Sequence, residues 1–447
     1  MASSPSSLPP WAKRREDPNP PDGWQEMPLV AASDIRFSNV DKKSYVSEKP
    51  VRLCNYMDVY NKEYVRGNED FMHATASEGE IARFAVQSGD VIITKDSETP
   101  DDIGVPAVVL DAPDDLLCGY HLALIRPRPD KVDPVFLAKQ VAHHRISRYY
   151  ARLANGLTRY GLTNTVVENT PVWLPEPPEQ HRVAGILRGI DEAIAKTEAL
   201  IAKLKAIKRG LLHDLLTRGL DDNGELRDPE KHPEQFKPSL IGLFPKTWTC
   251  AAVREISETF AGGTPPRNAA GMFGGSIPWV KSAEVNLREI SSTEETLTER
   301  GFFASSTRWV EAGSPLIAMY GATAGVVGWL AVRAVTNQAV LAIPPRSPDT
   351  NARWLYWVLR CRQWRLQAAI QGSGQPNLSK GIIDDIALPV PEPEEQIQIA
   401  SLMDSLEDRL LSEECYCVKL KSIKKGLMQD LLTGRVRVNA EASVKER

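Results

Sequence analysis

The sequence predicts an α+β protein in which two globular domains are separated by two long helices packed as an antiparallel coiled coil. The chain has 447 residues, which is enough for two or three domains. Residues 156–219 align without a gap on residues 372–435, a shift of 216 positions, so the chain contains an internal repeat. Apolar residues recur at every third or fourth position in both copies, which indicates long helices.

Each copy of the repeat begins and ends with a helix signal. A proline-rich motif, LPEPPEQ at 174–180 and LPVPEPEEQ at 388–396, opens each helix, because proline is tolerated in the first turn. The copies end in LKAIKRGLLHDLLT and LKSIKKGLMQDLLT, and Gly219 and Gly434 then provide stop signals. We therefore expect the first helix over residues 179–217 and the second over the matching positions.

The order of the segments favours packing of the two helices on each other. The first helix leads from the first globular segment to the second, where the second helix must begin. An antiparallel return would then give a pseudo-twofold molecule. The alternative is two helices that pack into separate cores. The predicted segments are a flexible N-terminal arm (1–22), a first domain (23–174), a central helical region (175–232), a second domain (233–388) and a C-terminal helical region (389–447).

Both globular segments have the pattern of mixed α+β domains. SGDVIITK, PAVVLD and HLALIRP in the first, and SPLIAMY, GVVGWLAV and QAVLAIPP in the second, are short apolar runs bounded by turn residues. Such runs are typical of strands. A basic stretch with a helical pattern follows in each segment, FLAKQVAHHRISRYYARL in the first and ARWLYWVLRCRQWRLQAAI in the second.

Composition and motifs argue against several classes of protein. The sequence has no apolar run that could span a membrane, no C-x-x-C pair and no apolar core of a secretion signal, so we expect a cytoplasmic protein. Phosphate-loop, H-E-x-x-H and G-x-S-x-G motifs are absent. Asn19-Pro20-Pro21 is similar to the catalytic tetrapeptide of adenine methyltransferases, but Asp22 replaces its aromatic residue. His143-His144 is interpreted as a solvated pair rather than a metal site.

Basic and aromatic residues alternate in the two helical stretches that follow the strands. The net charge is −4, so any DNA binding must come from local basic faces. One interpretation is that the aromatic residues belong to the core and the arginines to a solvated helix face. The other is a basic groove in each domain, whose cations neutralise phosphates while neighbouring loops reach base edges.

Together with the duplication, four motifs identify a resemblance. LPEPPEQHRVAGIL with LKAIKRGLLHDLLT, and LPVPEPEEQIQIASLM with LKSIKKGLMQDLLT, make the chain resemble the specificity subunit of type I restriction–modification systems. NGLTRYGLT, GGTPPR, SIPWVKSAEV and VTNQAVLAIPP are similar to elements of that family's target-recognition domains. The resemblance implies a non-catalytic subunit that reads an asymmetric bipartite site on double-stranded DNA, one half per domain. It also implies assembly with two adenine methyltransferase subunits and with motor–nuclease subunits, which would bind S-adenosylmethionine and ATP, while this chain would hold no cofactor or metal.

Long polar side chains in loops, and cations near them, are the predicted DNA contacts, since Arg suits guanine and Asn or Gln suits adenine. These residues are Lys95, Arg126, Arg128, Arg145, Arg148, Thr158, Arg159, Tyr160, Thr264, Lys281, Asn337, Gln338, Gln375, Asn377 and Lys380. The helices are predicted to set the domain spacing and to dock partners through Gln180, Val183, Leu187, Ile190, Lys205, Lys208, Gln396, Ile399, Met403, Leu406, Lys421 and Lys424. Two rival functions are a protein-interaction scaffold without salt-dependent DNA affinity, and a cryptic DNA methyltransferase or nuclease that acts as the purified chain.

Overall fold

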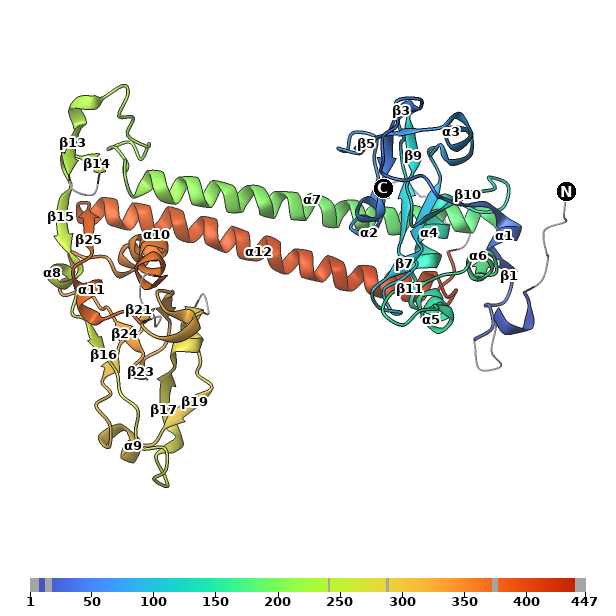
Figure 1. Ribbon diagram of the computed structural model, residues 1–447. Coiled ribbons are helices and arrows are strands. Elements are labelled where there is room, and N and C mark those ends of the chain that lie inside the picture. Colours follow the sequence, from blue (N-terminus) through green and yellow to red (C-terminus); the bar gives the residue numbers. More distant parts are fainter. Residues whose placement is uncertain (1–7, 13–17, 240–241, 287–288, 372–376, 439–447) are drawn as a thin grey trace, which may run out of the picture. The chain divides into compact units, whose positions relative to one another are not determined.

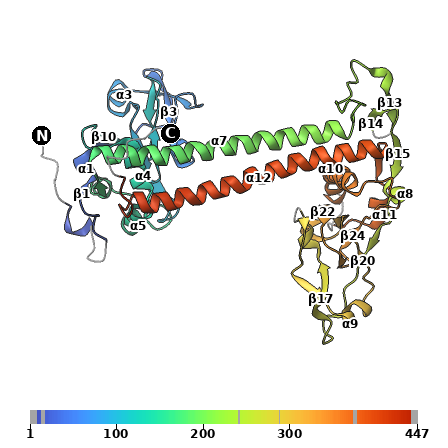
Figure 2. The ribbon, with the colours of Figure 1, turned by 180° about the vertical axis from the view of Figure 1, so that it is seen from behind.

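The computed structural model describes residues 8–12, 18–239, 242–286, 289–371 and 377–438. The chain divides into two compact units (Figures 1 and 2). Unit 1 comprises Met1–Glu198 and Tyr416–Arg447, and unit 2 comprises Ala199–Cys415. The long helices α7 (Pro177–Leu215) and α12 (Pro393–Leu431) each contribute one half to each unit. Each unit therefore combines one globular domain with two helix halves.

Two sheets form the globular part of unit 1. A five-stranded sheet has the order β2-β10-β6-β8-β4, and a three-stranded sheet has the order β5-β3-β9. The pairs β4–β8 and β3–β9 are parallel, and the other pairs in these sheets are antiparallel. Two short ladders, β1-β12 and β11-β7, complete the unit. The strands are β1 (Gln25–Pro28), β2 (Ser33–Phe37), β3 (Lys49–Cys54), β4 (Tyr64–Val65), β5 (Met72–Ala76), β6 (Val91–Thr94), β7 (Asp96–Ser97), β8 (Pro106–Val109), β9 (Leu116–Cys118), β10 (Leu122–Pro127), β11 (Tyr160–Gly161) and β12 (Pro171–Leu174).

The basic helical stretch predicted in unit 1 is divided into two helices. His143 lies between them with an extended backbone (ψ 141°), and its side chain accepts a hydrogen bond from the Arg145 amide and so caps the second helix. Asp133 caps the first helix, whose first residue is Pro134. The shorter helices of the unit are η1 (Pro10–Ala12), α1 (Leu29–Ala32), α2 (Tyr56–Tyr60), α3 (Glu78–Phe84), α4 (Pro134–Ala142), α5 (His144–Leu153) and α6 (Asn164–Glu168).

Unit 2 has the same pair of sheets as unit 1, with one strand added. Its five-stranded sheet has the order β16-β24-β21-β22-β18, and its four-stranded sheet has the order β19-β17-β23-β20. The parallel pairs are β18–β22 and β17–β23, in positions that correspond to the parallel pairs of unit 1. The ladders β13-β14 and β15-β25 complete the unit. The strands are β13 (Phe236–Ser239), β14 (Gly242–Pro245), β15 (Thr249–Ala252), β16 (Phe260–Ala261), β17 (Phe273–Val280), β18 (Glu289–Ile290), β19 (Glu295–Leu297), β20 (Trp309–Val310), β21 (Ser314–Ala318), β22 (Val327–Leu330), β23 (Ala334–Thr336), β24 (Val340–Ala342) and β25 (Ala387–Val390).

The cores of both units join the sheets to the long helices. In unit 1, Leu187 of α7 and Leu432 beyond α12 are buried in one cluster with residues of the sheet and of α4. In unit 2, Leu215 of α7 and Met403 of α12 are buried in one cluster with Trp354 and other residues of α10. The shorter helices of unit 2 are η2 (Pro233–Gln235), α8 (Val253–Ile256), η3 (Ser282–Asn286), α9 (Glu299–Phe303), η4 (Gly321–Thr323), α10 (Ala352–Gln371) and α11 (Lys380–Asp384).

The two long helices lie side by side within each unit (Figures 1 and 2). Ion pairs connect them, and within each unit the residue number on α12 falls as the number on α7 rises. This order confirms the antiparallel packing, and the alternative of helices in separate cores is wrong. The ion pairs are Asp191–Lys424 (2.7 Å) and Glu198–Lys421 (2.7 Å) in unit 1, and Lys205–Glu414 (2.8 Å) and Lys208–Glu407 in unit 2.

Candidate DNA interface

A set of main-chain hydrogen bonds, here called the loop frame, holds three loops of the first globular domain together. The Gly119 amide donates to the Cys54 carbonyl (2.9 Å) at the end of β3. The Lys95 amide donates to the His121 carbonyl (2.9 Å), and the Lys95 carbonyl accepts from Leu162 (2.9 Å). The frame therefore joins the loops after β6, before β10 and after α5.

The second globular domain has the same loop frame. The Asn337 amide donates to the Val280 carbonyl (3.0 Å) at the end of β17. The Met319 amide donates to the Ala339 carbonyl (2.8 Å), and the Met319 carbonyl accepts from Leu378 (2.8 Å). The three hydrogen bonds correspond one to one with those of the first domain. Since main-chain atoms make all of them, the two domains support different side chains on one arrangement of loops.

In the first domain the frame brings four predicted DNA contacts into one region. Tyr160 pairs with Ser97 in the β11–β7 ladder, and Lys95 immediately precedes β7. Thr158 and Arg159 line a hollow of about 770 Å³ beside this ladder. Sequence reasoning therefore selected side chains that the fold places together, although they come from segments more than 60 positions apart.

Sequence reasoning missed the acidic and aromatic lining of this hollow. Asp96, Glu98 and Asp102 line it together with the tyrosines of α2, whose rings are stacked 5.5 Å apart. Burial and the Asp102 carboxylate raise the pKa of Tyr56. Carboxylates repel phosphates but accept hydrogen bonds from base amino groups. A polar run directly after the buried strand β6 was the available sequence signal.

Four predicted contacts also meet in the second domain. The Thr264 hydroxyl is hydrogen-bonded to the Gln338 side chain, next to Asn337 of the frame. Lys281 follows the end of β17, where Glu294 (2.9 Å) and Glu295 (3.0 Å) hold its ammonium group. The hydrogen bonds that its ammonium group donates to these two carboxylates raise the pKa of Lys281. Lys281 therefore reaches the candidate surface already paired with acids.

The other predicted contacts of the second domain have different surroundings. Asn377 forms an isolated β-bridge with Tyr320, which corresponds to the pairing of Gly161 with Asp96 in the first domain. The Lys380 ammonium is paired with Asp384 inside α11. Gln375 lies outside the described residues.

Several basic residues of the first domain are engaged inside the fold. The Arg126 guanidinium is bound by the Asp90 carboxylate through two contacts of 2.8 Å, and Asp90 is buried. The Arg128 guanidinium donates to the Ala31 carbonyl (3.4 Å). Lys139, which sequence analysis grouped with the other cations as part of the basic stretch, is buried and paired with Asp191 and Glu63. These contacts connect structural elements and leave little of the predicted basic groove.

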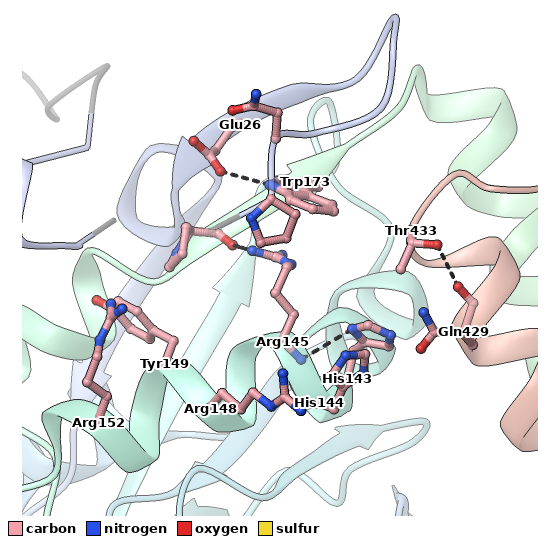
Figure 3. A pocket seen from close by; sticks show the side chains of 13 residues that line it. Glu26, His143, His144, Arg145, Arg148, Tyr149, Arg152, Trp173, Gln429 and Thr433 are labelled. Carbon is pink, nitrogen blue, oxygen red and sulfur yellow. Dashed lines mark hydrogen bonds between the residues drawn. The ribbon is translucent and has the colours of Figure 1, made fainter. Parts of the chain in front are cut away.

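The helix α5 carries the basic surface that remains in the first domain. Figure 3 shows its side chains around a hollow of about 760 Å³, with Arg145 reaching toward Trp173. The Arg145 guanidinium lies 4.0 Å from the Trp173 ring centre and donates to the Pro171 carbonyl (2.8 Å). Arg148 is exposed and has no carboxylate within ion-pair distance among the described residues. Arg148 is therefore the best placed of these cations to meet an anion.

The interpretation of His143 as a solvated residue is wrong, because His143 is buried beside this hollow. Only 5% of it is exposed, because it caps α5 from beneath. Burial, followed by the charges of His144 and Arg145, lowers the pKa of His143 to about 4. The imidazole is therefore neutral at physiological pH.

Two arginines of the basic stretch in the second domain contact the long helix α12. The Arg353 guanidinium pairs with Asp404 (2.8 Å), and the Trp357 indole donates to the same carboxylate (2.8 Å). Arg360 lies 3.5 Å from Glu407. Trp354 and Trp357 are fully buried. For Trp354 and Trp357 the interpretation as core residues is confirmed, and Arg353 and Arg360 are engaged by acids of α12.

Comparison with known proteins identifies the family. The model of the type I restriction modification DNA specificity domain matches the chain twice, at residues 30–206 and 245–415. The chain belongs to this family. It is the DNA specificity subunit of a type I restriction–modification system, which is the non-catalytic component of that enzyme complex. The double match confirms the duplication, and the rival scaffold and enzyme functions are wrong.

Relatives support the assignment along most of the chain. A Methanocaldococcus jannaschii protein assigned as the MjaX type I restriction enzyme specificity subunit is 22% identical over 364 residues, which cover 80% of this chain and 81% of the relative. The fold is similar to the crystal structure of the type I system S subunit from M. genitalium, with a TM-score of 0.59, 15% identity and coverage of 94% and 97%. A chain from a structural study of complex assembly in the type I system gives a TM-score of 0.50, 17% identity and coverage of 94% and 100%.

Equivalent glutamines fix both long helices of the specificity subunit at their first turns. The Gln180 side chain accepts from the Asp133 amide (3.0 Å) and donates to the carbonyls of Lys131 (2.9 Å) and Pro175 (2.8 Å). Gln396 makes the matching contacts with the amide of Asn351 and the carbonyls of Asp349 and Pro391. Only 1% of each glutamine is exposed, so these residues position the helices and offer no surface to a partner.

The apolar residues predicted on the helices are also internal. Val183, Leu187, Ile399 and Met403 are buried, and Ile190 and Leu406 are half-buried. All four predicted lysines form ion pairs between the helices, and Lys205 and Lys421 are exposed whereas Lys208 and Lys424 are half-buried. The exposed apolar residues are different ones, and two sets are equivalent by the 216-residue shift: Ile186 (40%) with Leu402 (44%), and Ile207 (44%) with Ile423 (43%).

Within the part of the chain that the structure describes, no group of three or more His, Cys, Asp or Glu side chains is placed to hold a metal ion. No helix among these residues is long and apolar enough to cross a membrane.

Proposed function

We propose that each recognition domain of the specificity subunit reads one half of an asymmetric bipartite site on double-stranded DNA. The duplicated loop frame is the observation that carries the proposal. Both domains hold the same loops by equivalent main-chain bonds, but the side chains there differ: the first domain carries Arg159 and Tyr160, and the second carries Gln338, to which Thr264 of another loop is hydrogen-bonded. Two similar supports with different side chains suit two half-sites of different sequence.

The contacts divide into two kinds by their surroundings. Arg148 on α5 and the exposed ends of neighbouring cations would neutralise phosphates, which gives salt-dependent affinity without sequence preference. Side chains beside the frame would meet base edges, because the acidic hollow near Arg159 disfavours phosphates. Substitution of Arg148 should therefore weaken binding to all sequences, whereas substitution of Arg159 should change the preferred sequence of one half-site.

We further propose that the long helices set the spacing between the half-sites and dock two adenine methyltransferase subunits. The exposed apolar residues occur in equivalent positions on both helices, so the chain carries two similar surfaces for two copies of one partner. Motor–nuclease subunits would join the full complex. S-adenosylmethionine and ATP would be bound by these partners, and the complex would act in the cytoplasm, where the cell's DNA lies.

Co-expression with the cell's own adenine methyltransferase subunit tests the proposal. The expected result is a complex of two methyltransferases per chain and methylation of adenines in one split motif. Ile186→Asp and Leu402→Asp should each lower the stoichiometry to one methyltransferase, and the double variant should bind none. Leu243→Asp is the control, because Leu243 is 52% exposed but lies on β14 and not on either long helix. Full occupancy in the double variant would contradict docking on these surfaces.

A further inference from the structure

The loop that carries Asn337 and Gln338 in the second domain has an equivalent loop in the first domain, and the bonds of the loop frame identify it. Residues 119–121 and 337–339 have the same length and the same anchors. The first residue of each donates its amide to the carbonyl at the end of a strand, and the third accepts from the residue after a central strand. Tyr120 therefore occupies the position of Gln338, and His121 occupies the position of Ala339.

His121 has an unusual backbone conformation at this position. Its φ is +71°, and it is the one residue other than glycine with a positive φ in the described part of the chain. Glycine would adopt this conformation with less strain. Strained residues are concentrated at functional sites, where the surrounding structure holds them. The positive φ therefore marks His121 as a candidate functional residue.

The imidazole of His121 is fixed by a second loop. Its Nδ1 is hydrogen-bonded to the carboxylate of Asp96, and Asp96 is held by the β7–β11 ladder that also carries Tyr160. The His121 side chain is 29% exposed, so part of the imidazole ring reaches solvent. The Tyr120 ring lies 3.7 Å from the imidazole, centre to centre, and Tyr120 is 49% exposed. The loop thus presents two adjoining rings beside the predicted contacts.

We propose that Tyr120 and His121 are specificity-determining residues that contact bases of the first half-site, with Asp96 as a positioning residue. When the imidazole donates its Nδ1–H to Asp96, its neutral form presents Nε2 as an acceptor. An acceptor complements the exocyclic amino group of adenine or cytosine in the major groove, and an exposed ring can pack on a thymine methyl group. This inference rests on the proposed bipartite recognition of DNA and adds a second loop to its first half.

Selection of bound duplexes from a randomised library by the full-length chain tests the assignment. The wild-type chain should select a two-part motif. His121→Gly, which suits the positive φ, and Tyr120→Ala should each reduce discrimination at one or two positions of the first half by about five- to tenfold. The second half should stay unchanged. Gln338→Ala should give the reciprocal result and relax the second half alone.

The control variant is His73→Ala, which removes an exposed histidine from the outer strand β5 of the same domain. It should select the wild-type motif. Asp96→Asn should relax the same positions as His121→Gly, with the affinity for unrelated DNA unchanged, as expected of a positioning residue. An unchanged first half in both His121→Gly and Tyr120→Ala would overturn the inference. If the wild-type chain itself selects no two-part motif, the proposed bipartite recognition fails, and the inference fails with it.

Discussion

The buried ion pair between Lys208 and Glu407 gives a stability prediction, and an exposed ion pair between the same two helices serves as its control. The Lys208 side chain is 15% exposed and that of Glu407 is 4% exposed, so the pair is buried between the two long helices. Removal of one partner from a buried ion pair costs about 3–5 kcal/mol, because the other charge stays in a poorly solvated site. Arg360, at 3.5 Å from Glu407, compensates part of that charge. We therefore expect Lys208→Met to lower the free energy of unfolding of unit 2 by about 3 kcal/mol.

The matched variant is Lys205→Met on the same helix. Lys205 pairs with Glu414 across the same helix interface, but their side chains are 56% and 36% exposed, so its loss should cost less than about 1 kcal/mol. Urea denaturation followed by tryptophan fluorescence measures both, since Lys208 lies 5.3 Å from the Trp357 ring. With a slope of about 2 kcal/mol per molar, Lys208→Met should shift the midpoint by about 1.5 M.

Two outcomes would refute this reasoning. Equal losses in Lys208→Met and Lys205→Met would show that burial does not decide the contribution of these pairs. The double variant Lys208→Met/Glu407→Leu should recover most of the lost stability, because it removes the uncompensated charge. A double variant as unstable as the single one would show that the lysine stem, rather than its charge, stabilises the helices.

Three further predictions use the same structure. Gln396→Ala removes the three hydrogen bonds of a buried side chain and should destabilise unit 2 by about 2–3 kcal/mol in the urea assay, whereas Gln396→Glu should recover only the bond accepted from Asn351. The pKa of His143 is about 4 in the fold, below its ordinary value of about 6.5, so the unfolded state binds more protons between these values. Stability should therefore fall by about 1.4 kcal/mol per unit as the pH drops from about 6.5 to 4, and urea titrations of His143→Gln should show a flatter profile. Arg148→Ala should reduce the slope of log binding constant against log salt concentration by about one, without changing the selected motif. Arg159→Ala should weaken binding by more than about 1 kcal/mol and relax the first half-site. Identical motifs from both variants would contradict the division of roles.

The helices and the duplication could be predicted because their signals are local or strictly periodic. The shift of 216 positions is constant across both blocks, and prolines mark the starts of α7 and α12 within two residues of the observed positions. The antiparallel direction followed from the order of the segments alone. These features depend little on which distant side chains meet.

The roles of charged residues could not be predicted in the same way. The sequence shows Arg126 as one cation in a basic stretch, but its partner Asp90 precedes it by 36 positions and is brought close by the sheet. Lys281 likewise meets Glu294 and Glu295 only because β19 returns antiparallel to β17. Whether a cation is free for a phosphate depends on such tertiary pairings, which no pattern of spacing contains.

The loops of the candidate interface were only half predictable. Asn337 and Gln338 were selected because their amide side chains suit base edges, while Tyr120 was passed over although it occupies the same position in the loop frame as Gln338. The equivalence of the two loops rests on main-chain hydrogen bonds, and residues 119–121 and 337–339 have no identical amino acid at matching positions. Sequence comparison of the two halves could not align them for that reason.

The division of unit 1 between the two ends of the chain has a consequence for its synthesis. Gln140 donates to the carbonyl of Leu432 (2.8 Å), Arg437 pairs with Glu179 (2.7 Å), and Lys424 pairs with Asp191 (2.7 Å). On the ribosome, the first recognition domain emerges complete while all three of these partners are still untranslated. Glu179 and Asp191 therefore lack these cations until the whole second domain has been synthesised. A ribosome that stops within α12 would therefore release a chain whose defect lies at its opposite end, in the domain that was made first.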